Sequence, residues 1–177
     1  MTAYNEYGNA LFMLAKEEDS IESVLSDSKI AAAILEDNSE YIKLLDTPAV
    51  SNEEKIRLID EAFGTLGYSV INLLKILAQK KAVYKFREVF AAFFKAYDEE
   101  MGIERVEAVT AVPMSEEQIK KMSDKLAAVT CKKIIIKNTV SPEILGGVKL
   151  RYSGIQLDGS VKSRLDAFAE NLKNIVV

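Results

Sequence analysis

The chain has 177 residues and contains no His, no Trp, one Cys and three Pro. Without His it has neither a Ser–His nor a Cys–His nucleophile, and no imidazole that could bind a metal ion. The single cysteine, Cys131, excludes an internal disulfide and a cysteine-rich zinc site. These absences remove the usual catalytic sites of small enzymes, so we expect no catalytic residue, no metal and no cofactor.

Long apolar runs are absent as well. Uninterrupted ones such as residues 30–35 and 89–94 do not exceed six residues, whereas a membrane-spanning helix needs about 20 residues. Residues 1–6 contain no basic stretch and are not followed by a long apolar one, as they would be in a secretion signal. We therefore expect a protein without direct membrane insertion, in a reducing compartment.

Acidic and basic residues are distributed unevenly along the chain. The net charge of −4 argues against a general nucleic-acid-binding protein, because neutralising phosphates requires a basic surface. Residues 1–101 hold 11 basic and 18 acidic side chains, whereas residues 102–177 hold 12 basic and 9 acidic ones. This asymmetry indicates two modules with different partners, or simply two solvated surfaces that differ in composition.

The first hundred residues have the periodicity of successive α-helices. Apolar residues recur at spacings of three and four, as in Tyr4, Tyr7, Leu11 and Leu14, which places them on one helical face. The same pattern predicts further helices over about 21–35, 41–45, 51–63, 68–79 and 83–101. Residues 1–102 are therefore expected to form an all-α N-terminal six-helix bundle.

The pattern changes after Gly102. Alternating or β-branched apolar residues predict strands over 106–112, 133–137, 148–152 and 155–157. A capping box of Ser115 and Gln118 starts a helix that reaches about residue 129, and a last helix is expected to begin at Ser160. Cys131 is interpreted as a small apolar residue at the start of the second strand. Residues 103–177 are expected to form a small α+β C-terminal domain with the order β-α-β-β-β-α.

Three segments could be mistaken for ligand sites. Gly146-Gly147 lacks the continuation and the following helix of a phosphate loop, so it is interpreted as a turn. A polar cluster at the start of the last helix could hold an anion, or could form only a turn and an N-cap. This cluster consists of Asp158, Ser160, Lys162 and Arg164.

The third segment combines basic and aromatic residues, as nucleic-acid-binding surfaces do. Because it lies in the acidic half of the chain, we expect it to face solvent or an acidic protein. It comprises Lys80, Lys81, Tyr84, Lys85, Phe86 and Arg87. By elimination, the residues indicate a two-module binding or structural protein.

Four segments, taken in order, resemble one protein family. They are Tyr-Gly-Asn-Ala-Leu-Phe at 7–12, residues 45–48 followed by Lys55, Ala-Val-Thr-Ala-Val-Pro-Met-Ser at 108–115, and a C-terminal signature of 146–148 and 158–165. Together they resemble the delta subunit of F-type ATP synthases, the family of the mitochondrial oligomycin sensitivity-conferring protein. The resemblance extends over residues 4–172, and Gly8 stands where the family usually has Ala.

This resemblance implies a non-catalytic stator component. In the family, the helical domain holds the catalytic head through N-terminal segments of alpha subunits, and the C-terminal domain joins a peripheral stalk of b-type subunits. The chain would then be a peripheral part of the ATP synthase on the cytoplasmic face of a bacterial plasma membrane. Neither a nucleic acid nor a small-molecule substrate is implied.

The family places its alpha-subunit site between the first and fifth helices. The corresponding residues are Tyr7, Ala10, Leu11, Leu14, Asn72, Ile76 and Gln79. For Leu11 and Leu14 a place in the core is the favoured interpretation, so Tyr7, Ala10 and Gln79 are the better candidates for contact. Family-signature residues on the structural or stalk side are Gly146, Gly147, Asp158, Gly159, Ser160 and Arg164. The alternative function is a helical RNA-binding transcription regulator of the antitermination-factor type, which would need a continuous basic surface.

Overall fold

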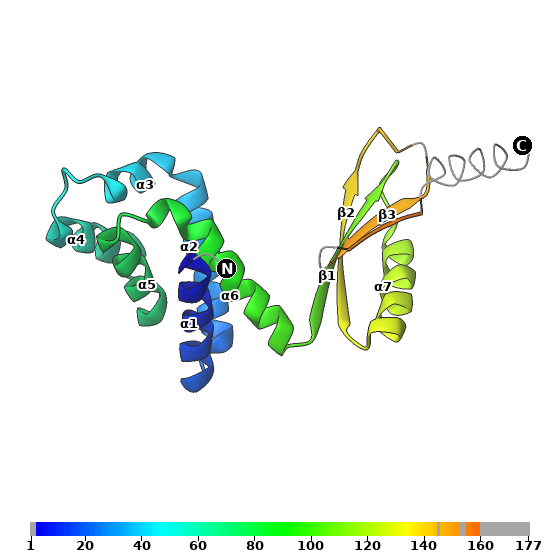
Figure 1. The fold of residues 1–177 in the computed structure, drawn as a ribbon, viewed down its shortest axis with the longest axis horizontal. Coiled ribbons are helices and arrows are strands. Elements are labelled where there is room, and N and C mark those ends of the chain that lie inside the picture. Colours follow the sequence, from blue (N-terminus) through cyan, green and yellow to red (C-terminus); the bar gives the residue numbers. More distant parts are fainter. Residues whose placement is uncertain (1–2, 145, 153–154, 160–177) are drawn as a thin grey trace, which may run out of the picture. The chain divides into compact units, whose positions relative to one another are not determined.

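The computed structural model describes residues 3–144, 146–152 and 155–159. The chain divides into two compact units, Met1–Tyr97 and Asp98–Val177, and each is described here by itself. Within the described residues the first unit is helical and the second contains a four-stranded sheet (Figure 1). This confirms the expected class of a helix-rich protein with a small sheet.

The helices of the first unit follow the predicted apolar stripes closely. They are α1 (Ala3–Glu17), α2 (Ile21–Asp37), α3 (Ser39–Asp46), α4 (Asn52–Phe63), α5 (Tyr68–Gln79) and α6 (Phe86–Glu100). A short 3₁₀ turn, η1 (Val83–Lys85), precedes α6, so the last expected helix of this unit begins with a tighter turn than its periodicity indicated.

A single apolar cluster fills the first unit. Leu35, Phe63 and Phe93 are fully buried in it. Phe12 of α1 meets Phe93 of α6 edge to face, with ring centroids 6.1 Å apart, an arrangement that aromatic pairs favour. Each stripe at three-four spacing therefore stabilises its helix by burying one face in this common core.

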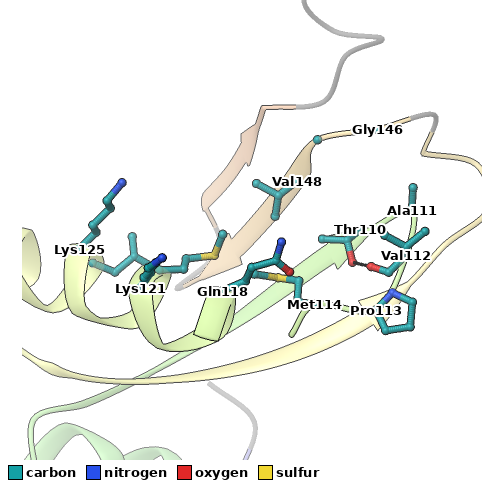
Figure 2. Close-up of a pocket in the computed structure, with 13 residues that line it drawn as sticks. Thr110, Ala111, Val112, Pro113, Met114, Gln118, Lys121, Lys125, Gly146 and Val148 are labelled. Atoms are coloured by element: carbon teal, nitrogen blue, oxygen red, sulfur yellow. Dashed lines mark hydrogen bonds between the residues drawn. The ribbon is translucent and has the colours of Figure 1, made fainter. Parts of the chain in front are cut away.

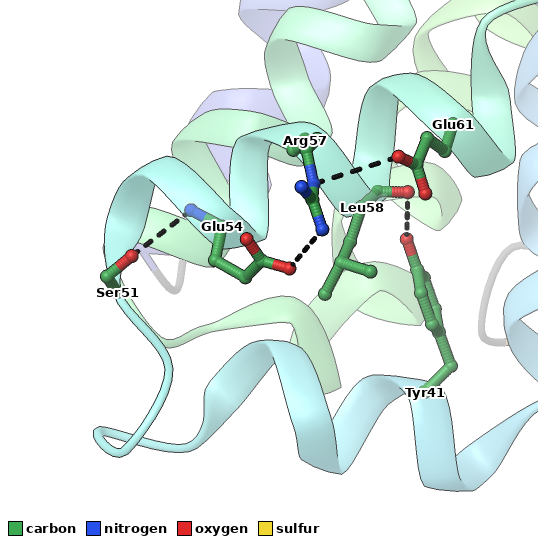
Figure 3. Close-up of polar contacts among 6 residues, drawn as sticks. All are labelled: Tyr41, Ser51, Glu54, Arg57, Leu58 and Glu61. Atoms are coloured by element: carbon green, nitrogen blue, oxygen red, sulfur yellow. Dashed lines mark hydrogen bonds and ion pairs between the residues drawn. The ribbon is translucent and has the colours of Figure 1, made fainter.

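Polar contacts fasten α4 to its surroundings (Figure 3). The Ser51 hydroxyl accepts a hydrogen bond from the Glu54 backbone N–H and caps the helix, as expected. Tyr41 of α3 donates its hydroxyl to the Leu58 carbonyl, 2.9 Å away. Burial, with a smaller contribution from Glu61, raises the pKa of Tyr41 to about 12. Lys55, in the segment that resembles the family, is only 1% exposed and so belongs to the interior of this unit.

The described residues of the second unit form a mixed sheet with one helix beside it. Its elements are β1 (Ile103–Thr110), α7 (Glu116–Thr130), β2 (Lys133–Val140), β3 (Val148–Tyr152) and β4 (Ile155–Asp158). The strands lie in the order β2-β1-β3-β4, with β1 and β2 parallel and the other neighbours antiparallel. The predicted last helix from Ser160 lies outside the described residues.

The sequence predicts the N-terminal end of α7 correctly but not its C-terminal end. Ser115 and Gln118 form the predicted capping box at its N-terminus. The interpretation of Cys131 as a small apolar residue that starts the second strand was wrong. Cys131 is exposed and adopts a left-handed conformation, with φ 55°, as the C-cap of α7. Helices commonly end on such a residue, so the strand begins only at Lys133.

Candidate functional site: a groove between two helices of the first unit

A groove of about 350 Å³ lies between α1 and α5. Both helices contribute residues at spacings of three and four, so each presents one continuous face to the groove. The lining residues are Tyr7, Ala10, Leu11, Leu14 and Glu18 of α1, and Tyr68, Ser69, Asn72, Leu73 and Ile76 of α5.

The opposite side of α1 is held against the core. Phe12 and Ala15 are buried there, and Gly8 lies directly against α6. A Cβ atom on Gly8 would overlap the Val89 carbonyl oxygen and lie 2.8 Å from the Ala92 Cβ. The absence of a side chain at Gly8 therefore lets the two helices approach and fixes which face of α1 lines the groove.

The other wall, α5, is anchored at its start and along its length. The backbone N–H of Gly67, its N-cap residue, donates to the Asp27 carboxylate at 2.8 Å. Lys75 forms an ion pair with Asp60 of α4 at 2.6 Å. Leu74 and Leu77 are buried on the core side of the helix. These contacts hold the groove-facing residues of α5 in place without using any of them.

The groove has a buried apolar floor and exposed apolar walls. Leu11 and Leu73 are 4% and 6% exposed, whereas Leu14 and Ile76 are both 41% exposed. Exposed aliphatic side chains beside a buried floor are suited to receive the apolar face of a partner helix. At one end the Ser69 hydroxyl donates to Glu18 at 3.4 Å, which gives that end a polar, acidic rim.

Six of the seven residues expected at this position line the same groove. Gln79 does not, because it is the exposed last residue of α5. Leu11 is the buried floor residue, while Leu14 is exposed on the wall. The sequence interpretation missed Glu18, Tyr68, Ser69 and Leu73. Continuing each stripe by three or four residues would have found Glu18 from Leu14, and Ser69 and Leu73 from Asn72 and Ile76.

The signature residues of the second unit lie around the ends of β3 and β4. Gly147 has a φ of 85°, a value that favours glycine, in the segment just before β3. Asp158 forms an ion pair with Lys149 at 3.0 Å, and the Gly159 N–H donates to the Val148 carbonyl at 3.0 Å. Ser160 and Arg164 lie outside the described residues, as does Lys162, so of the predicted polar cluster only Asp158 is described.

Two residues of the basic and aromatic segment 80–87 form ion pairs with carboxylates. Lys85 pairs with Glu88, and Arg87 with Glu36 at 3.1 Å. Phe86 is buried and so presents no stacking surface. Two positive charges of this segment are therefore paired, and one of its two aromatic rings is not available to stack on a base.

A second hollow, of about 580 Å³, lies in the second unit (Figure 2). It is bounded by the end of β1, the start of β3 and one side of α7. Its lining includes Thr110, Met114, Met122, Leu126 and Val148.

The described part of the chain contains neither a grouped set of metal ligands nor a membrane-spanning helix. Across residues 3–144, 146–152 and 155–159, no three Cys, Asp or Glu side chains are grouped so that they could hold a metal ion. In the same residues no helix has both the length and the apolar character needed to cross a bilayer.

Comparisons with known proteins agree along nearly the whole chain. Residues 4–172 match the family described as the ATP synthase delta (OSCP) subunit. The ATP synthase subunit delta of Clostridioides difficile is 32% identical over 174 residues, which is 97% of this chain and 96% of that protein. Its counterpart in Chlorobium phaeobacteroides is 30% identical over 171 residues, 96% of this chain and 94% of that protein.

A solved structure shows the same likeness. A chain in the Toxoplasma gondii mitochondrial ATP synthase hexamer aligns with a TM-score of 0.74 and 25% identity. The alignment covers 97% of this chain and 98% of that one. These similarities are consistent with a role in a peripheral stalk and give no support to the RNA-binding alternative.

Proposed function

The chain belongs to the ATP synthase delta (OSCP) subunit family, and on this premise we propose that it is a stator component without catalytic activity of its own. It would connect the alpha/beta catalytic head to the peripheral stalk, so that the head does not turn with the rotor. Residues 1–102, as a six-helix bundle, would hold the head, and residues 103–177 would join the b-type stalk subunits. Its location would be the cytoplasmic face of a bacterial plasma membrane, as a peripheral part of the complex.

The observation that carries this proposal is the groove between α1 and α5. Two apolar stripes on helices that are distant in sequence line one hollow, with exposed Leu14 and Ile76 on its walls. We propose that an N-terminal segment of an alpha subunit binds there as an amphipathic helix. The stripe from Tyr7 to Glu18 is about 16 Å long at 1.5 Å per residue, which corresponds to about three turns of a bound helix.

The negative charge around the groove favours a partner segment that carries basic residues. Glu18 lies at one end of the groove, and residues 1–101 carry 18 acidic against 11 basic side chains. An approaching segment with basic residues on its polar side would therefore be favoured in rate and orientation. Salt should then slow association more than it speeds dissociation.

Ala10 offers the sharpest test, because it is an exposed, small residue that lines the groove. Ala10→Trp would fill space that the partner helix needs. We expect the affinity of the full-length chain for a synthetic peptide of the alpha-subunit N-terminus to fall at least about tenfold, or about 1.4 kcal/mol. Isothermal titration calorimetry measures this change.

Ala33→Trp is the matched control, since Ala33 is an exposed alanine on α2 that does not line the groove. Its affinity should equal that of the unmodified chain. The proposal is contradicted if the unmodified chain does not bind the peptide, or if both tryptophan variants lose affinity equally.

A further inference from the structure

The groove between α1 and α5 has two ends that differ in charge. Ser69, in the first turn of α5, donates to Glu18, which follows the last residue of α1, so the end of one helix lies beside the start of the other. The two helices therefore run antiparallel along the groove. At the far end the lining residues are Tyr7 of α1 and Ile76 of α5. A residue that continues the α5 stripe past Ile76 consequently lies at the end opposite Glu18.

Lys80 continues the stripe of α5 in this way. It follows Ile76 by four residues, its backbone is helical with φ −81° and ψ −3°, and its N–H donates to the Ile76 carbonyl at 3.0 Å. Residues four apart share one face of a helix, so Lys80 lies on the face of α5 that lines the groove. Lys80 is exposed, and within the described part of the chain no carboxylate pairs with it. This end of the groove therefore presents a positive charge.

Glu18 has the corresponding position on α1. It follows Leu14 by four residues, and its N–H donates to the Leu14 carbonyl at 3.0 Å. Its carboxylate accepts from the Ser69 hydroxyl at 3.4 Å, a contact that leaves its negative charge in place. Lys16, the basic residue in the last turn of α1, lies opposite the groove stripe on a helical wheel. Tyr68 lines the same end and is 77% exposed, and an aromatic ring of this kind attracts cations.

Other charged residues near the two ends modify this difference without removing it. Glu17 precedes Glu18 and adds to the negative end, and Lys81 follows Lys80 and adds to the positive end. Glu6 of α1 opposes the two lysines, but on a helical wheel it lies to one side of the stripe that lines the groove. The groove is therefore negative at one end and positive at the other, with apolar walls between.

We propose that these two ends fix the direction in which a partner helix binds, with its basic end against Glu18 and Tyr68 and its acidic end against Lys80. The apolar walls alone would accept a helix in either direction, because apolar contacts are not directional. Acidic residues stabilise the first turn of a helix and basic residues the last. A partner of this common kind lies parallel to α1, with its first turn at Lys80. This inference rests on the proposed binding of a helix in the groove and adds the charge pattern that the partner carries.

Paramagnetic NMR of the isotope-labelled full-length chain tests the direction. The probes are two synthetic peptides of about four helical turns, each with one stripe of Leu and Ile and a nitroxide at its N-terminus. The first peptide has Glu in its first turn and Lys in its last, and the second has these residues exchanged. We expect the nitroxide of the first peptide to broaden amide signals near Lys80 at least about fivefold more than those near Glu18. The second peptide should give the opposite result.

A charge exchange in the chain itself provides the matching variant. Glu18→Lys combined with Lys80→Glu exchanges the charges of the two ends and leaves the net charge unchanged. In this variant the nitroxide of the first peptide should broaden signals near position 18 instead. The control combines Lys120→Glu with Asp124→Lys, which exchanges two exposed charges on α7, outside the groove. The control should leave the direction of both peptides unchanged.

Equal broadening at both ends would overturn the proposal, as would the same direction for both peptides or an unchanged direction in the variant with exchanged charges. Failure of both peptides to bind would overturn it too. Because the charges are exposed, the preference should decline in about 1 M salt, and a preference that persists there would contradict an electrostatic origin. Calorimetry with the alpha-subunit peptide and Ala10→Trp tests the proposed function separately, because that affinity is measured whatever the direction of the bound helix.

Discussion

The two hollows of this protein look alike as apolar depressions beside a helix, but the described residues around them differ in how deeply they are buried. The groove between α1 and α5 has a floor that belongs to a continuous cluster of buried residues, with Leu11 and Leu73 nearly inaccessible. The hollow beside α7 is bounded by a helix that has no fully buried residue. The first is a surface feature on a finished core and suits an external partner. The second lies, among the described residues, beside side chains that are only half-buried, such as Val148.

The largest effect that sharpens this comparison is expected from Phe93→Ala. Phe93 is fully buried and packs edge to face on Phe12, so its removal should lower the free energy of unfolding by about 3–5 kcal/mol. Urea denaturation followed by far-UV circular dichroism measures the change. Val129→Ala, at an 84% exposed position of α7, should change it by less than about 0.5 kcal/mol. Similar losses in both variants would mean that the two units do not differ as described.

Gly8→Ala should have the next largest effect. Its new Cβ would meet the α6 backbone, so α1 would have to shift, and overpacking of this kind costs about 1–3 kcal/mol. The better helix propensity of Ala offsets about 1 kcal/mol of that loss. We expect a net decrease in the unfolding free energy and weaker binding of the alpha-subunit peptide. Glu6→Ala, at an exposed position of α1, is the control and should change neither. A more stable Gly8→Ala variant would show that α1 and α6 can separate at no cost.

The smallest effect is expected from Tyr41→Phe, which removes one hydrogen bond at the edge of the first core. The loss should be about 0.5–1.5 kcal/mol at neutral pH. Because folding raises the pKa of Tyr41 from 10.0 to about 12, its contribution is complete below pH 10 and is lost as the pH rises through 12. Stability of the unmodified chain should therefore fall more steeply between pH 10 and 12 than that of Tyr41→Phe. Parallel curves would show that Tyr41 titrates alike in both states.

Much of this fold could be predicted from periodicity, because each helix of the first unit buries one face in a shared core. Local chemistry placed two helix starts correctly, at Ser51 and Ser115. Periodicity identifies which face of a helix is apolar, but not which helices become neighbours. The pairing of α1 with α5 came from family resemblance, and the structure brought six of the predicted residues together.

Other features depend on tertiary contacts that no local pattern contains. Nothing around Gly8 in the sequence shows that α6 approaches it. Lys55 is buried although a lysine in a polar helix is normally expected at the surface. Cys131 took the position of a C-cap because α7 ended there and the chain had to reverse toward β2, and its neighbours gave no glycine signal for this.

The central claim is that the groove between α1 and α5 receives the partner segment. Amide hydrogen exchange of the full-length chain, with and without the alpha-subunit peptide, tests this claim directly. We predict that the peptide slows exchange in α1 and α5 and leaves α7 unchanged, because α7 does not line that groove. Slower exchange in α7 upon addition of the peptide, with α1 and α5 unaffected, would contradict the account.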